Sequence, residues 1–282
     1  MKNTVIGVIG TGIMGGGIAQ MFAERGFQTL IWDTTPAFTA NGLKKISKRL
    51  AGSVEKGKLT AAEAEAIQSR IQPVENLSDL ADVALVIEAI IEDFDAKTSL
   101  YTQLEKVLSP QAAIGTNTSS LSVSELARSL IHPERFLGVH FFNPPTKLEL
   151  VEVIATSALA PAVLDKVREI LVACGKTAVN VKDSPGFIVN RLLLPLINEA
   201  AKLVDAGVAS PEEIDTAMCL GAMHPTGPLH VADLIGLDVC HHILTSLSRA
   251  LNQSTYLPAA ALTERIAAGH LGRKSGQGFY TY

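Results

Sequence analysis

Three glycines near the N-terminus are spaced as a phosphate-binding turn requires. Gly10, Gly12 and Gly15 stand in G-x-G-x-x-G register between an apolar strand pattern, Val5 to Ile9, and a helical pattern. The first glycine permits a tight turn, the second lets the backbone approach a pyrophosphate, and the third allows close packing of helix on strand. N–H groups and the positive end of the helix dipole then favour an anion.

Asp33 ends the next predicted strand, residues 28–33, and lies 23 residues after the first glycine, close to the expected spacing of about 20. A carboxylate at this place can accept hydrogen bonds from the hydroxyls of a ribose and repels a 2′-phosphate, so the pattern favours NAD over NADP. The alternative is an ordinary strand–helix–strand unit with a glycine-rich turn and a solvated Asp33.

His140 and Glu152 are the candidates for proton transfer. Imidazole has an unperturbed pKa that suits this work near neutral pH. His140 lies near the carboxyl end of a predicted strand, 135–143, and Glu152 lies on the next strand, 148–154. A carboxylate among apolar neighbours needs a partner, and here it could fix the tautomer of the imidazole and stabilise the imidazolium. The alternative is a core histidine that a backbone carbonyl satisfies.

Alternating strands and helices must position these groups. The pattern predicts further strands over 81–88, 112–116 and 176–181, and helices over 36–55, 95–108 and 161–174. Such alternation is typical of an α/β fold with a doubly wound, mostly parallel sheet, in which ligands bind beyond the carboxyl ends of the strands.

The chain changes character at Ser184–Pro185, which predicts two domains, 1–184 and 185–282. The second reads as all-helical, with helices over 187–205, 211–220, 229–251 and 257–268. Its small size and its many apolar positions predict a homodimer formed through this C-terminal domain.

The composition excludes several classes of protein. The 282 residues are 47% hydrophobic and carry a net charge of −4, which does not suit nucleic-acid binding. No apolar run reaches the ~18 residues of a membrane span, and the first strand begins too early to leave room for a leader peptide. The three cysteines lack metal-ligand spacing, so we expect no metal and a reduced, cytoplasmic chain.

The predicted helix 36–55 and the residues just after it are the most basic part of the chain. A solvated face is the usual meaning of such a charge run. The alternative is a contact for an acidic ligand such as the phosphates of coenzyme A. The basic residues are Lys44, Lys45, Lys48, Arg49, Lys56 and Lys58.

Six motifs in this order resemble the L-3-hydroxyacyl-CoA dehydrogenase family, in particular its short bacterial 3-hydroxybutyryl-CoA dehydrogenases. The resemblance covers essentially the whole chain, and the later motifs are far more specific than the glycine turn. The motifs span residues 10–15, 116–120 (TNTSS), 140–144 (HFFNP), 183–191 (DSPGFIVNR), 225–229 (PTGPL) and 272–280 (GRKSGQGFY).

The resemblance implies a Rossmann-type domain and NAD-dependent oxidation of an (S)-3-hydroxyacyl-CoA, such as 3-hydroxybutyryl-CoA, to the 3-oxoacyl-CoA, and the reverse. Fatty-acid and butanoate metabolism are both compatible with this reaction. The resemblance makes His140 the general base and Glu152 its partner, and Ser119 and Asn190 would bond the reacting substrate. The implied NAD-binding residues are Gly10, Gly12, Ile13, Met14, Gly15, Asp33, Glu92, Lys97, Ser119, Asn143 and Lys274. Those implied for the acyl-CoA are Ser119, Asn190, Arg49, Lys56 and Lys97.

Two other functions fit the same motifs. Lens λ-crystallin and its gulonate dehydrogenase relatives resemble the same family, so the substrate could be a free hydroxy acid or a sugar acid. Recruitment of a crystallin also makes a non-catalytic NAD-binding or structural protein an alternative. The complete set of His140, Glu152, Ser119 and Asn190 argues for an enzyme.

Overall fold

The computed structural model describes residues 4–282, and the chain divides into two compact units between Asp183 and Ser184. The division falls one residue before the predicted boundary. None of the helices within residues 4–282 combines the length and the hydropathy that a membrane span requires.

The first unit is built on one eight-stranded sheet with the order β3-β2-β1-β4-β5-β6-β7-β8. Only the β6–β7 pair is antiparallel, so the carboxyl ends of the first six strands share one edge. This confirms the predicted doubly wound, mostly parallel sheet. The strands are β1 (Val5–Ile9), β2 (Gln28–Trp32), β3 (Ile71–Pro73), β4 (Leu85–Glu88), β5 (Ala113–Thr116), β6 (Phe136–Phe141), β7 (Leu150–Ala155) and β8 (Thr177–Lys182).

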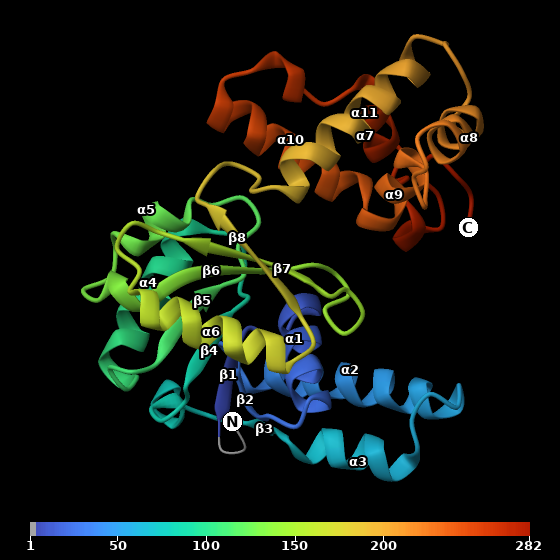
Figure 1. Ribbon diagram of the computed structural model, residues 1–282. Coiled ribbons are helices and arrows are strands. Elements are labelled where there is room, and N and C mark those ends of the chain that lie inside the picture. The colour runs from blue at the N-terminus through green and yellow to red at the C-terminus, as the bar shows by residue number, and fades with distance from the viewer. Residues whose placement is uncertain (1–3) are drawn as a thin grey trace. The chain divides into compact units, whose positions relative to one another are not determined.

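Helices cover this sheet, and Figure 1 shows α6 lying across its near face. Helix α2 spans the predicted residues because Thr35 caps it and Pro36 follows at the first helical position. The helices are α1 (Ile13–Glu24), α2 (Pro36–Glu55), α3 (Ala61–Ser69), α4 (Phe94–Val107), α5 (Val123–Ala127) and α6 (Pro161–Ala173), with single turns η1 (Leu77–Leu80) and η2 (Pro133–Arg135).

The core of this unit lies between sheet and helices. Ile6, Val8 and Ile87 are fully buried in the central strands, and Ile18 and Phe22 of α1 pack with them. Strands buried on both faces read as near-continuous apolar runs, which is why the sequence pattern reveals them.

The second unit is helical, but the predicted single helix 229–251 is wrong. Gly236 adopts φ 104°, a left-handed conformation that ends one helix, and a new helix begins at the next residue. The helices are α7 (Val189–Asp205), α8 (Pro211–Gly221), α9 (Pro228–Ile235), α10 (Leu237–Leu251) and α11 (Ala260–Ala267), with turns η3 (Ser254–Tyr256) and η4 (Arg273–Ser275).

Two buried aspartates hold the C-terminal tail of this unit. Asp233 accepts hydrogen bonds from the backbone N–H groups of Phe279 and Tyr280 and from the Tyr282 hydroxyl, at 2.9, 3.0 and 3.2 Å. Asp215 accepts a bond of 2.8 Å from the Tyr280 hydroxyl. The tail is therefore an integral part of the helical unit.

Candidate active site

The glycine turn between β1 and α1 has the geometry of a phosphate cradle. A Cβ on Gly10, at φ 88°, would lie 2.5 Å from the Ala89 carbonyl oxygen, and one on Gly15 would lie 1.7 Å from the Gly10 oxygen. A Cβ on Gly12 would meet nothing within 4 Å. Gly10 and Gly15 are thus required by the fold, whereas the backbone at Gly12 is open to a ligand.

Helix α1 begins at this turn, at Ile13 and Met14, and its N-cap residue Gly12 has no side chain to cap the first turn. Its first N–H groups and the positive end of its dipole suit a negatively charged group. The donor set and the open backbone together fit the pyrophosphate of a dinucleotide.

Asp33 follows β2 and is bonded to the glycine turn itself. Its Oδ2 accepts hydrogen bonds from the backbone N–H and the side-chain hydroxyl of Thr11, both at 2.7 Å. Its Oδ1 accepts from the Thr34 N–H at 2.8 Å. Because Thr11 belongs to the turn, these bonds place the Asp33 carboxylate beside the predicted pyrophosphate site. Asp33 is only partly buried, so its carboxylate still reaches solvent.

His140 and Glu152 form a buried pair. They occupy directly opposed positions of the antiparallel β6–β7 ladder, and His140 Nδ1 lies 2.8 Å from Glu152 Oε2. Only 6% of His140 and 1% of Glu152 is exposed. His140 lies near the carboxyl end of β6, on the sheet edge where the glycine turn also lies. The pairing orients the imidazole and assigns Nδ1 to the carboxylate.

A buried ion pair lies at the end of β4. Glu88 accepts hydrogen bonds from Lys97 Nζ and the Tyr101 hydroxyl, each at 2.6 Å, and from the Thr116 hydroxyl at 2.8 Å. Burial and the adjacent Glu88 carboxylate raise the pKa of Tyr101, which therefore stays a neutral donor. Lys97 is 1% exposed, and its ammonium group balances the charge of the buried Glu88 carboxylate.

Glu92 links this ion pair to the serine loop after β5. One of its oxygens, Oε1, accepts bonds from the Thr118 hydroxyl at 2.6 Å and from the N–H groups of Ser119 and Ser120 at 2.8 and 2.9 Å. Lys97 Nζ lies 3.4 Å from the other oxygen. Burial by itself raises the pKa of Glu92, but Lys97 and the three hydrogen bonds outweigh it and leave the pKa below its ordinary value. A charged Glu92 thus holds the loop that carries Ser119.

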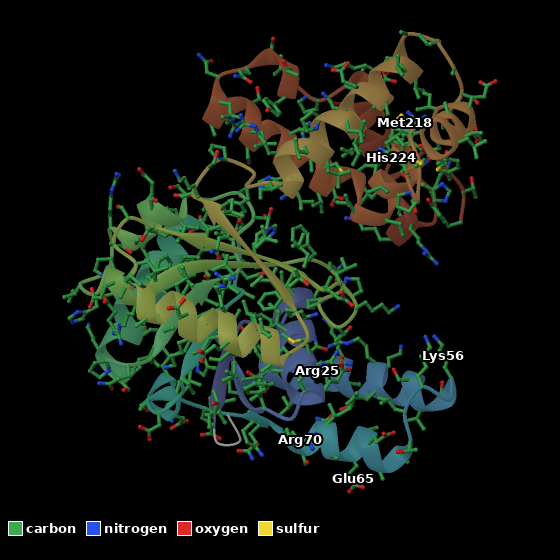
Figure 2. The ribbon with its side chains drawn as sticks, in the orientation of Figure 1. Arg25, Lys56, Glu65, Arg70, Met218 and His224 are labelled. Atoms are coloured by element: carbon green, nitrogen blue, oxygen red, sulfur yellow. The ribbon has the colours of Figure 1, made fainter. Side chains whose placement is uncertain are left out.

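The remaining predicted residues of the first unit lie on its surface. Arg49 of α2 donates to Gln20 and to the Gly16 carbonyl, at 2.7 and 3.0 Å, and so ties α2 to α1. Lys56 projects from the end of α2 (Figure 2). Asn143 is exposed and precedes Pro144 in a cis peptide bond.

Two predicted site residues belong to the helical unit. Asn190 lies in the first turn of α7 and is 8% exposed. Lys274 forms an ion pair with Asp238 of α10, with Nζ 2.5 Å from the carboxylate.

The sequence pattern did not identify Thr11 or the hydrogen-bond partners of Glu88. Glu88 closes an apolar strand, where a carboxylate needs a partner. The lysine nine residues later, Lys97, was a signal for that partner. Thr11 gave no signal, since the middle residue of a G-x-G turn is unrestricted in the pattern.

Known proteins match this chain over its whole length. The family model for the NAD-binding domain of 3-hydroxyacyl-CoA dehydrogenase matches residues 5–184, and the model for the C-terminal domain of that family matches 186–282. The probable 3-hydroxybutyryl-CoA dehydrogenase of Bacillus subtilis is 44% identical over 282 residues, which cover all of this chain and 98% of that protein. The 3-hydroxybutyryl-CoA dehydrogenase of Bradyrhizobium diazoefficiens is 43% identical over 98% of this chain and 94% of its own.

Solved structures agree with these matches. The crystal structure of (S)-3-hydroxybutyryl-CoA dehydrogenase from Ralstonia eutropha superposes with a TM-score of 0.92 at 38% identity, covering 99% of both chains. FadB2 from Mycobacterium tuberculosis gives a TM-score of 0.95 at 37% identity, covering 98% of both. The chain therefore belongs to the 3-hydroxyacyl-CoA dehydrogenase family, whose members are NAD-dependent oxidoreductases acting on a CH–OH group.

Proposed function

We propose that this chain interconverts (S)-3-hydroxybutyryl-CoA and the corresponding 3-oxoacyl-CoA, with His140 as general base. The observation that carries the proposal is the buried pair of His140 and Glu152, with 2.8 Å between His140 Nδ1 and Glu152 Oε2. The pair lies at the same edge of the sheet as the glycine turn. The names of the relatives support the choice of substrate.

NAD would be held at the glycine turn between β1 and α1 and would supply the acceptor for the hydride from C3 of the substrate. The substrate hydroxyl gives its proton to Nε2 of His140. Glu152 holds Nδ1–H, keeps the ring oriented and stabilises the imidazolium that forms. Ser119 and Asn190 would hydrogen-bond the reacting oxygen or the thioester carbonyl and so orient the acyl group.

The remaining predicted contacts belong to the same proposal. Gly10, Gly12, Ile13, Met14 and Gly15 bind the pyrophosphate of NAD and Asp33 binds its ribose. Further contacts to NAD come from Glu92, Lys97, Asn143 and Lys274, and contacts to the acyl-CoA come from Arg49, Lys56 and Lys97.

NADH absorbance during turnover tests this proposal on the purified full-length chain. We expect turnover of (S)-3-hydroxybutyryl-CoA and loss of activity with free 3-hydroxybutyrate. His140→Ala should lower kcat on the order of 10²–10⁴-fold with little change in NAD affinity. Glu152→Gln should also lower kcat while the chain stays folded.

Other results would favour the alternatives. Preference for the free acid indicates a hydroxy-acid or sugar-acid dehydrogenase, and NADH binding without turnover of any of these substrates indicates a non-catalytic protein. Near-normal turnover by His140→Ala would exclude His140 as the base.

We also propose a cytoplasmic homodimer that pairs through the helical unit. Large apolar side chains are exposed there, including Leu192 at 69%, Leu220 at 81% and Met223 at 89%. The unpaired cysteines fit a reducing compartment, and burial raises the pKa of Cys174 and Cys240 to about 12. Light scattering should give twice the chain mass, and a monomer mass would contradict the proposal.

A further inference from the structure

Thr11 is buried inside the glycine turn, and both of its polar donors point to the same atom. Only 4% of Thr11 is exposed, and its backbone N and its Oγ1 each lie 2.7 Å from Asp33 Oδ2. A carboxylate oxygen has about two acceptor positions. The two donors of Thr11 therefore occupy Oδ2 completely.

The other oxygen of Asp33 is left for a ligand. Oδ1 accepts a bond of 2.8 Å from the Thr34 N–H and a long one of 3.4 Å from the Thr34 hydroxyl. Thr34 is exposed and its hydroxyl can rotate toward water, so a further donor can take the second acceptor position of Oδ1. Thr11 thus determines both the rotamer of Asp33 and which of its oxygens can accept a bond from a ribose hydroxyl.

The surroundings hold the Thr11 side chain in this orientation. Its hydroxyl also lies 2.9 Å from the Phe38 carbonyl oxygen, but a hydroxyl has one proton and the charged carboxylate is the stronger acceptor. Gly42 of α2 packs against it so closely that a Cβ there would lie 2.5 Å from Thr11 Cβ. Rotation of the side chain away from Asp33 is therefore restricted.

We propose that the Thr11 hydroxyl is a positioning group that sets nucleotide specificity by orienting Asp33 toward the adenosine ribose. The inference rests on the proposed ribose contact of Asp33. While the two hydrogen bonds from Thr11 hold Asp33, its Oδ1 is preorganised for a 2′-hydroxyl. The negative charge of the Asp33 carboxylate, held at the same place, disfavours a 2′-phosphate.

Direct binding of NADH and NADPH to the full-length chain tests this, with nucleotide fluorescence as the readout. Thr11→Val removes the hydroxyl but keeps the β-branched shape, and Thr11→Ala removes it without adding bulk beside Gly42. Because Asp33 itself remains and only its orienting bond is lost, NADH should bind roughly 3- to 10-fold more weakly, the effect of one ordinary net hydrogen bond. NADPH binding does not depend on a hydrogen bond to Oδ1, so it should weaken less than NADH binding. The ratio of NADH affinity to NADPH affinity should therefore fall.

Thr11→Ser is the matched control, because it keeps the hydroxyl and should keep the NADH preference within about twofold of the parent chain. Unchanged preference in both Thr11→Val and Thr11→Ala overturns the inference. An equal loss in Thr11→Ser also overturns it, because the methyl group and not the hydroxyl would then matter.

Asp33→Asn separates this inference from the proposed function. If Asp33→Asn retains the full preference for NADH, the ribose contact itself is wrong. If Asp33→Asn loses the preference while Thr11→Val keeps it, only the role of Thr11 is wrong.

Discussion

At the scale of single residues, the first unit uses charge in two different ways. Glu88 neutralises Lys97 in a fully buried cluster, whereas Glu92 stays partly exposed, at 26% of its side chain, and gathers the N–H groups of Ser119 and Ser120. Removing one partner of a buried pair is costly, because the other charge is left unpaired. Glu88 thus serves the fold, and Glu92 shapes the loop of the site.

Glu92→Gln should destabilise the chain in a pH-dependent way. The folded pKa of Glu92 lies below its ordinary value, so the charged form is favoured by folding. Its contribution to stability is complete above the ordinary pKa of about 4.3 and is lost as the pH falls through the lower folded value. Urea unfolding at pH 7 and near pH 3.5 should show a stability difference from the parent chain that shrinks at the lower pH.

Glu125→Gln provides the control for that series. Glu125 pairs with Arg128 at the surface, with its side chain 58% exposed, and such pairs contribute little. If the Glu92 variant behaves as this control does at both pH values, the loop does not depend on the Glu92 charge.

At the scale of elements, the glycines of the β1–α1 turn differ in why they are needed. Gly15→Ala places a Cβ 1.7 Å from the Gly10 oxygen, so we expect a loss of at least about 2 kcal/mol of unfolding free energy. Gly12→Ala has φ −65° and open space, so it should unfold like the parent chain. Its methyl group would instead obstruct the nucleotide, and NADH should bind about tenfold more weakly.

Thermal unfolding and NADH titration of the two variants together check this difference. A Gly12→Ala chain that binds NADH normally would show that the pyrophosphate does not approach this backbone. A stable Gly15→Ala chain would show that α1 can shift away from its strand.

The elements also explain which features the sequence could predict. Buried parallel strands and capped helices are local patterns, so β4 and α2 were recognisable from their own residues. The break at Gly236 was missed because a glycine inside an apolar helical pattern does not reveal its φ. The pairing of Glu152 with His140 was predicted because a carboxylate among apolar neighbours needs a partner and His140 lies on the adjacent predicted strand. The hydrogen bonds between Thr11 and Asp33 depend instead on tertiary geometry.

At the scale of the whole molecule, the predicted fold, family and cofactor are confirmed by the sheet topology and by the two family models that span the chain. Specific motifs distributed from residue 10 to residue 280 made this possible, because each constrains a different part of the chain. The last of them, the segment ending in Gly278-Phe279-Tyr280, has a structural explanation in the buried Asp233.

Asp233→Asn should therefore destabilise the helical unit although it is nearly isosteric. Asp233 is 1% exposed and accepts from two backbone N–H groups, on Phe279 and Tyr280, and from one hydroxyl. An amide would turn an NH₂ toward one of these donors, which costs about 2–3 kcal/mol of unfolding free energy. Asp205→Asn, at an exposed position at the end of α7, is the control and should change it by less than about 0.5 kcal/mol. Equal stability of the two variants in urea would mean that the tail is held by its aromatic packing and not by the buried carboxylate.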